Sequence, residues 1–114
     1  MLPSSRRIEK SFFNEIFKKG SFSHSDNLFL VFYKNPKVVK SGSRFAFSVS
    51  KKVSKKATVR NKLRRRGYSI VKNLINEIKP HYFAVFVLKE GSVKLSFDDF
   101  SNQIEKLLKK SSLI

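Results

Sequence analysis

Residues 44–88 place one long amphipathic helix between two strands, and this pattern constrains the fold more than any other feature of the chain. Between Thr58 and Ile78, apolar residues and one glycine recur every three or four positions, as on the buried face of a helix. They are Val59, Leu63, Gly67, Ile70, Leu74 and Ile78. Arg44 to Ser50 alternates like a half-buried strand, and Tyr82 to Leu88 is apolar throughout, like a strand buried on both faces. We therefore expect a two-layer α/β sandwich whose helix links two parallel strands by the usual right-handed crossover.

Shorter elements precede this unit. The pattern from Ser11 to Lys19 predicts a helix that Ser11 caps and Gly20 ends. The apolar run from Leu28 to Tyr33 predicts a strand. Thr58 is the expected cap of the long helix, because its hydroxyl can accept a hydrogen bond from the first turn.

A final helix is expected to begin at Ser96 or Asp98 and to run to Lys110. In the strand Arg44–Ser50, alternation divides the side chains between two faces. Phe45, Phe47 and Val49 share one face, and Arg44, Ala46, Ser48 and Ser50 share the other. The second face is small and polar, so it is either open to solvent or shaped to admit a ligand. With 114 residues, of which 40% are hydrophobic, the chain is expected to be one domain covering residues 1–114.

Positive charge is the strongest signal in the composition. The chain holds 25 Lys and Arg against 8 Asp and Glu, a net charge of +17, and no acid occurs between Asp26 and Glu77. The segment from Lys51 to Arg66 alone carries nine basic residues. A solvated helix face normally mixes Glu with Lys, and cations at a helix start oppose its dipole. We therefore expect a polyanionic partner, with nucleic acid first and an anionic membrane second.

The candidate binding residues divide into a lysine loop and an arginine-rich helix start. They are Lys51, Lys52, Lys55, Lys56, Arg60, Asn61, Lys62, Arg64, Arg65, Arg66 and Tyr68. Arg grips phosphate or base edges through a planar fork, whereas Lys offers a mobile point charge. A helical wheel places Asn61, Arg65 and Tyr68 opposite the Leu63 stripe. Asn61 is either an exposed helix residue or a partner for a base edge, and Tyr68 either a surface residue or a stacking platform.

Nothing in the sequence predicts catalysis by the protein itself. The only histidines, His24 and His81, have no paired carboxylate nearby, and no catalytic or metal-binding motif is present. We predict no catalytic residue and no metal ligand. The absence of Cys and of a long apolar run predicts a cytoplasmic protein.

Two segments closely resemble the signature of the protein subunit of bacterial ribonuclease P. They are Phe47-Ser48-Val49-Ser50-Lys51-Lys52 and Ala57-Thr58-Val59-Arg60-Asn61-Lys62-Leu63-Arg64-Arg65. The likeness extends to Leu2-Pro3, Arg7-Ile8 and the run from Phe13 to Gly20. Lys62 stands where the family usually has Arg, which keeps the charge and loses the fork. Gly67 interrupts the helix, so close packing of helix on sheet is expected there.

The resemblance implies an α+β fold. Its sheet would be small, mixed and four-stranded, with a left-handed βαβ crossover, like domain 2 of ribosomal protein S5. On handedness we follow the resemblance over the general rule. The resemblance further implies that the chain is a subunit of the endoribonuclease that removes the 5′ leader from precursor tRNA. The protein would bind the catalytic RNA and the leader, and it would screen the repulsion between these two polyanions. It would act as one monomer in a 1:1 ribonucleoprotein. Mg²⁺ would be bound through the RNA and not by the protein alone. The leader would lie in a cleft formed by the first helix and one sheet face. The residues of this chain at the matching positions, which would line or border that cleft, are Phe13, Phe17, Val31, Ser48 and Ser50.

Three other functions remain open from the residues alone. A ribosomal or general double-stranded-RNA protein would bind any A-form helix with similar affinity. A DNA-binding factor would need a helix-turn-helix, whereas a strand, loop and helix stand there. A membrane-surface role fits least, because the helix stripe is needed against the sheet and no Trp is present.

Overall fold

The computed structural model describes residues 2–114. Within that range the chain forms three α-helices, four strands and four short 3-10 turns. In chain order they are η1 (Ser4–Arg6), η2 (Lys10–Phe12), α1 (Phe13–Lys19), β1 (Ser21–His24), β2 (Leu28–Lys34), β3 (Arg44–Ser48), α2 (Ala57–Leu74), η3 (Ile75–Glu77), β4 (Tyr82–Leu88), η4 (Ser92–Lys94) and α3 (Phe97–Lys110).

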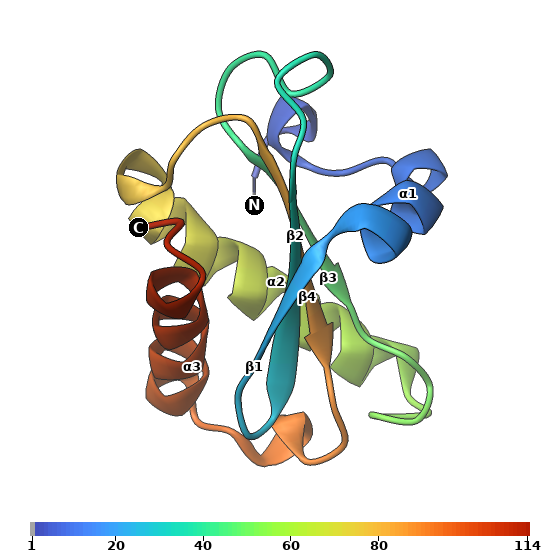
Figure 1. Ribbon diagram of the computed structural model, residues 1–114. Coiled ribbons are helices and arrows are strands. Elements are labelled where there is room, and N and C mark those ends of the chain that lie inside the picture. The colour runs from blue at the N-terminus through green and yellow to red at the C-terminus, as the bar shows by residue number, and fades with distance from the viewer. Residues whose placement is uncertain (1) are drawn as a thin grey trace.

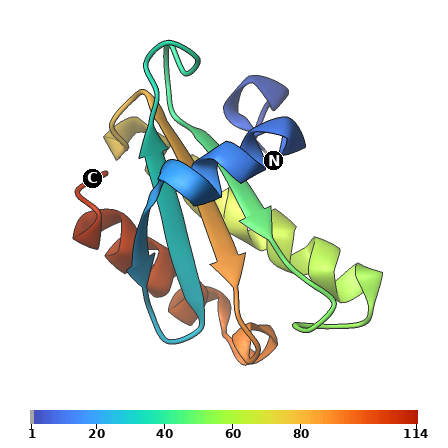
Figure 2. The same ribbon diagram turned by 45° about the vertical axis from the view of Figure 1, so that its right-hand side comes forward.

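The four strands form one mixed sheet in the order β1-β2-β4-β3. β1 and β2 pair antiparallel, as do β2 and β4, whereas β3 and β4 run parallel. In Figure 2, β3 and β4 both point downward, α2 lies behind the sheet, and β4 lies to the left of β3. That arrangement is a left-handed crossover, so the handedness implied by the resemblance is confirmed and the expectation from the general rule is wrong here.

Helices cover the two faces of the sheet unequally. α2 and α3 pack on one face, and α1 lies across part of the other (Figures 1 and 2). Phe45, Phe47 and Phe86 point into the larger core beneath α2 and α3. A smaller core under α1 contains Ile16, Val31 and residues of β3 and β4. The α+β sandwich is therefore as expected, with one sheet face only partly covered.

Gly67 lies where α2 packs directly against the Phe47 ring of β3. A Cβ atom built at this position would lie less than 3.0 Å from three ring atoms of Phe47. Real Cβ contacts are essentially never that short, so a side chain at residue 67 would displace the helix or the ring. The expectation that close helix–sheet packing explains this glycine is confirmed.

Several predicted boundaries need correction. Ser11 lies in η2 and does not cap α1, whose N-cap residue is Phe12, although Gly20 does end the helix. Thr58 lies inside α2, which begins at Ala57 without a side-chain cap. The long helix stops at Leu74 instead of Ile78, because its last turn tightens into η3.

Two strands also differ from expectation. The sequence pattern does not predict β1, because this strand has only four residues and most of their side chains are polar. β3 ends at Ser48 instead of Ser50. Its predicted inner face is correct, since Phe45, Phe47 and Val49 are all at most 5% exposed.

Candidate nucleic-acid interface

The basic segment forms the loop between β3 and α2 and the first turns of α2. The side chains of Lys51, Lys52, Lys55, Lys56, Asn61, Lys62 and Arg65 are exposed, and those of Arg60, Arg64 and Arg66 are half-buried. Arg60 Nη1 donates to the carbonyls of Ser54 and Lys55, each at 3.0 Å. Arg60 therefore holds the lysine loop against the helix start, a role that the sequence did not reveal.

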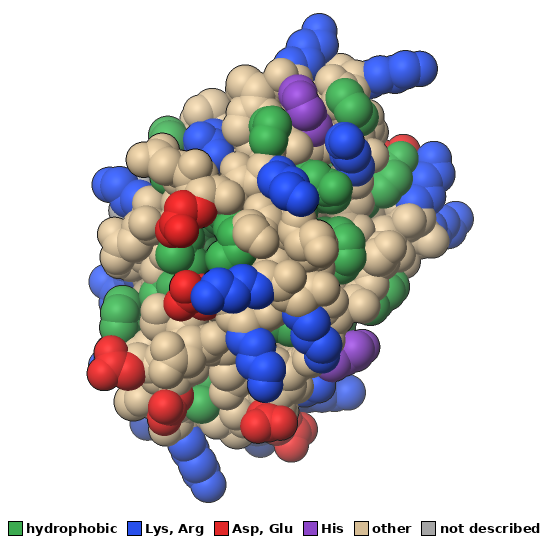
Figure 3. Space-filling model, turned by 60° about the vertical axis from the view of Figure 1, so that its left-hand side comes forward, with side chains coloured by type: hydrophobic (Ala, Val, Ile, Leu, Met, Phe, Trp, Pro, Cys, Tyr) green, Lys and Arg blue, Asp and Glu red, His purple; other side chains and the backbone are tan. Residues whose placement is uncertain are grey.

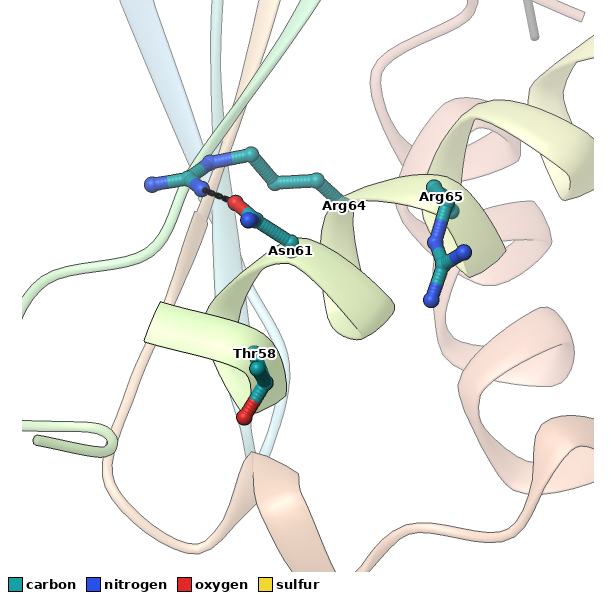
Figure 4. A pocket seen from close by; sticks show the side chains of 4 residues that line it. All are labelled: Thr58, Asn61, Arg64 and Arg65. Carbon is teal, nitrogen blue, oxygen red and sulfur yellow. Dashed lines mark hydrogen bonds between the residues drawn. The ribbon is translucent and has the colours of Figure 1, made fainter. Parts of the chain in front are cut away.

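Arg64 shapes a hollow on the outer side of α2. Its Nη1 donates to Asn61 Oδ1 at 2.8 Å, and its Nη2 donates to the Val49 carbonyl at 3.3 Å. Thr58, Asn61, Arg64 and Arg65 line a hollow of about 440 Å³. Figure 4 shows Arg64 reaching toward the strands and Arg65 pointing another way. The hollow presents donors from two guanidinium groups, which suits a phosphate or a base edge.

Cations at the start of α2 have no acidic neighbours to neutralise them. Within residues 2–114, the ion pairs shorter than 4.0 Å are Lys19–Glu15 and Lys109–Glu105, on other helices. The first turn of α2 contains no acid. Viewed from the side where α3 lies, acidic side chains stand among basic ones (Figure 3). The charge on α2 is therefore concentrated and unpaired, as expected of a surface that binds a polyanion.

Tyr68 does not belong to this exposed surface. It is 8% exposed, and its ring packs edge-on against Phe47 with the centroids 5.1 Å apart. Burial raises the pKa of its hydroxyl, an effect opposed by a hydrogen bond to the Phe47 backbone and by the charges of Arg7 and Arg64. The wheel prediction that Tyr68 faces outward is wrong, because the N-terminal segment and β3 widen the buried side of α2.

A second surface lies on the sheet face that α1 leaves partly open. The strand register aligns one residue from each strand in a row across this face: His24, Phe29, Val87 and Ser48. His24 is exposed, and the other three are half-buried. The His24 and Phe29 rings lie 5.3 Å apart, and Phe22, 48% exposed, lies 6.1 Å from Phe29.

Lys89 supplies the positive charge beside these rings. Its Nζ lies 6.0 Å from the Phe29 ring centroid and donates to the Ser25 carbonyl at 3.1 Å. We call Phe22, His24, Phe29, Val87, Lys89 and Ser48 the open sheet face. Aromatic rings beside a cation are the usual means of holding single-stranded nucleic acid.

The predicted cleft residues only partly coincide with the open sheet face. Phe13 and Phe17 lie on α1 with their rings 6.3 Å apart, and Phe17 is 36% exposed. Ser48 lies in the aligned row, whereas Ser50 is exposed beyond the end of β3. Val31 is fully buried under α1, so it can border the predicted cleft from beneath but does not line it.

Phe29 belongs to the open sheet face but is absent from the residues predicted from the sequence. It lies two positions before Val31 on the same strand and therefore on the same face. The alternation of side chains between the two faces of β2 is the sequence signal that would have predicted Phe29 on this face. Phe22 and His24 could not be found in this way, because β1 itself was not predicted.

An α+β domain with unpaired arginines at a helix start and open aromatic rings on its sheet has the features of a nucleic-acid-binding protein. The family model described as Ribonuclease P matches residues 2–112. The chain therefore belongs to the ribonuclease P protein family and is a protein subunit of that endoribonuclease. Membership implies association with the RNA subunit.

Individual relatives agree with this assignment. The ribonuclease P protein component of Microcystis aeruginosa is 30% identical over 115 residues, covering 99% of this chain and 96% of that protein. That of Clostridioides difficile is 33% identical over 104 residues, covering 89% and 86%. No helix within residues 2–114 is long and apolar enough to cross a membrane.

Solved structures share the fold. The RNase P protein of Staphylococcus aureus matches with a TM-score of 0.85 at 22% identity, covering 97% of this chain and 98% of that one. That of Thermotoga maritima matches with a TM-score of 0.81 at 26% identity, covering 91% and 96%.

Proposed function

We propose that the chain binds the RNA subunit of ribonuclease P through the lysine loop and the start of α2, and the 5′ leader of precursor tRNA through the open sheet face. One protein acts per RNA subunit. Phosphate oxygens of the RNA are ligands that Mg²⁺ prefers, so Mg²⁺ would be held by the RNA and would supply Lewis-acid chemistry for the hydrolysis there. The protein screens the repulsion between two polyanions and positions the leader.

The unpaired cations at the start of α2 carry this proposal. Cations there oppose the helix dipole by roughly 0.3–1 kcal/mol each when exposed. No acid in the first turn offsets that cost, and Arg60 and Arg64 hydrogen-bond to carbonyl and amide oxygens that carry no net charge. A bound phosphate backbone would neutralise this charge and release counterions.

The open sheet face suits an unpaired strand better than a duplex. Neighbouring strands in a sheet lie about 4.8 Å apart, so a row of four side chains spans roughly 15 Å. That width accommodates a few stacked or splayed nucleotides and is too narrow for an A-form helix, which is recognised across successive minor grooves. Phe22, His24 and Phe29 offer ring faces, and Lys89 offers a cation for the backbone.

Salt-dependent binding tests the contact with the RNA subunit. Arg65→Ala removes an exposed guanidinium from α2, and Lys106→Ala removes an exposed cation from α3 as a matched control. We expect Arg65→Ala to weaken binding and to reduce the slope of log affinity against log salt by about one. Lys106→Ala should leave both unchanged. If Arg65→Ala left the slope of the wild type intact, the α2 surface would be solvated and the proposal would fail.

Cleavage assays test the leader contact. With the cognate RNA at low Mg²⁺, the protein should stimulate cleavage of precursor tRNA. In binding measurements, Phe29→Ala should weaken the affinity for leader-bearing tRNA and leave the affinity for mature tRNA unchanged. Stacking on one ring is worth about 1–3 kcal/mol per base. Cleavage by the protein without RNA, equal to cleavage with it, would contradict the proposal. Equal affinity for leader-bearing and mature tRNA would instead indicate a general RNA-binding protein.

A further inference from the structure

A second hollow lies on the side of α2 that faces the start of α3. Lys62, Arg65, Arg66, Ser69 and Phe97 line it, and its volume is about 420 Å³. Arg65 and Arg66 each lie three or four residues from both Lys62 and Ser69, so these four residues share one side of the helix. Phe97 is the first residue of α3 and is 43% exposed. A large apolar ring thus stands in water beside several cations.

We propose that this hollow binds one unpaired nucleotide of the RNA subunit, with its base stacked on Phe97. The phosphates on either side would contact Lys62 and Arg66, and the Ser69 hydroxyl would serve the sugar or the base edge. This inference rests on the proposed function and extends the RNA-binding surface beyond the Ala57–Arg65 signature to Arg66, Ser69 and Phe97.

Continuity with the first hollow supports a nucleic-acid occupant. Arg65 lines both hollows, so a strand that binds at Asn61 and Arg64 reaches Phe97 by crossing a single side chain. Consecutive nucleotides therefore fit the two hollows on adjacent sides of α2. A protein partner would not need this continuity.

The charges around Phe97 favour the same occupant. Asp98 and Asp99 follow Phe97, yet neither forms an ion pair shorter than 4.0 Å with Lys62 or Arg66 in residues 2–114. The Asp99 backbone N–H donates to the Ser96 hydroxyl, and acids at this position suit the dipole of α3. The cations of the hollow consequently remain available to a phosphate, while the ring offers the flat face that any base can use.

Single-tryptophan reporters test the stacking directly, because the chain contains no tryptophan. Phe97→Trp places the only indole in the hollow. Val93→Trp is the matched control, since Val93 is also 43% exposed and does not line the hollow. On titration with the cognate RNA subunit, we expect the fluorescence of Phe97→Trp to fall at least twofold. The fluorescence of Val93→Trp should stay constant.

Affinity measurements separate stacking from charge. Phe97→Ala should weaken binding to the RNA subunit about tenfold, as expected for loss of one base stack, without changing the salt slope. Arg66→Ala should reduce the slope by about one. Val93→Ala should bind like the wild type.

Each other result overturns the inference in a recognisable way. Equal quenching of both reporters, or of neither, would mean that no base stacks specifically on residue 97. A fluorescence change that grows with protein concentration in the absence of RNA would identify a second copy of the chain as the occupant. If Arg65→Ala leaves the salt slope unchanged, the proposed function is wrong. If Arg65→Ala reduces the slope but the Phe97 variants behave like their Val93 controls, α2 still binds the RNA subunit and only the nucleotide site at Phe97 is wrong.

Discussion

Replacing Gly67 with alanine tests how the fold presents the basic surface. In an exposed helix this substitution stabilises by roughly 1 kcal/mol, because alanine is the better helix former. Here the added Cβ would lie less than 3.0 Å from the Phe47 ring. The two effects have opposite signs, and the structure decides which is larger.

The Phe47 ring has no room to yield. It stacks on Phe86 with centroids 4.9 Å apart, meets Tyr68 edge-on at 5.1 Å and Phe100 at 6.3 Å, and is itself 4% exposed. Overpacking a filled core typically costs about 1–3 kcal/mol. After the gain in helix propensity, we expect Gly67→Ala to lower the free energy of unfolding by about 1 kcal/mol. That loss corresponds to roughly 4 °C in melting temperature for a domain of this size.

Urea unfolding followed by circular dichroism measures this balance. Asn73→Ala, on an exposed position of the same helix, is the control and should be neutral or slightly stabilising. Phe47→Leu in the Gly67→Ala background should remove most of the clash, so the two substitutions should be strongly non-additive. A Gly67→Ala protein more stable than the wild type would refute the tight helix–sheet contact.

Three further predictions follow from single contacts. Ser96→Ala removes the hydroxyl that accepts from the Asp99 N–H and should lower the free energy of unfolding by about 1 kcal/mol in urea titrations. Burial raises the pKa of the Tyr68 hydroxyl above its ordinary value of 10.0, so the wild type loses stability as pH rises through that raised pKa. Tyr68→Phe has no ionisable hydroxyl at this position and should not lose stability for this reason. The stability difference between wild type and Tyr68→Phe should therefore be constant below about pH 10 and change only above it. Arg60→Ala frees two loop carbonyls, so amide hydrogen exchange around Ser54 should accelerate relative to Arg65→Ala.

Periodic patterns in the sequence predicted the core well. The apolar run from Tyr82 to Leu88 predicts β4 with the bounds that the structure shows, since an apolar run between turn signals has few other interpretations. The inner face of β3 followed from strict alternation. Gly67 could be interpreted from sequence because a glycine on an apolar stripe needs a packing reason.

Surface geometry was harder to predict, because it depends on neighbours that are distant in sequence. Tyr68 looked exposed on a wheel, yet the structure buries it against Phe47. Val31 is expected from the resemblance to line or border the cleft, and its side chain is fully buried with Ile16 of α1. The handedness of the crossover came only from the family resemblance. No periodicity encodes which way a helix returns to its sheet.

The β3–α2 connection explains why the two proposed RNA contacts belong to one small domain. Ser48 ends the aligned row of the open sheet face, and the next carbonyl along the chain, that of Val49, accepts from Arg64 at 3.3 Å. A leader strand that leaves the sheet at Ser48 therefore arrives at the hollow where the RNA subunit is proposed to bind. Two polyanions brought this close repel each other strongly unless cations lie between them. In the proposed arrangement the lysine loop, which Arg60 holds in place, would lie between the two RNAs, so the segment that links strand to helix is also the one that would have to carry the most charge.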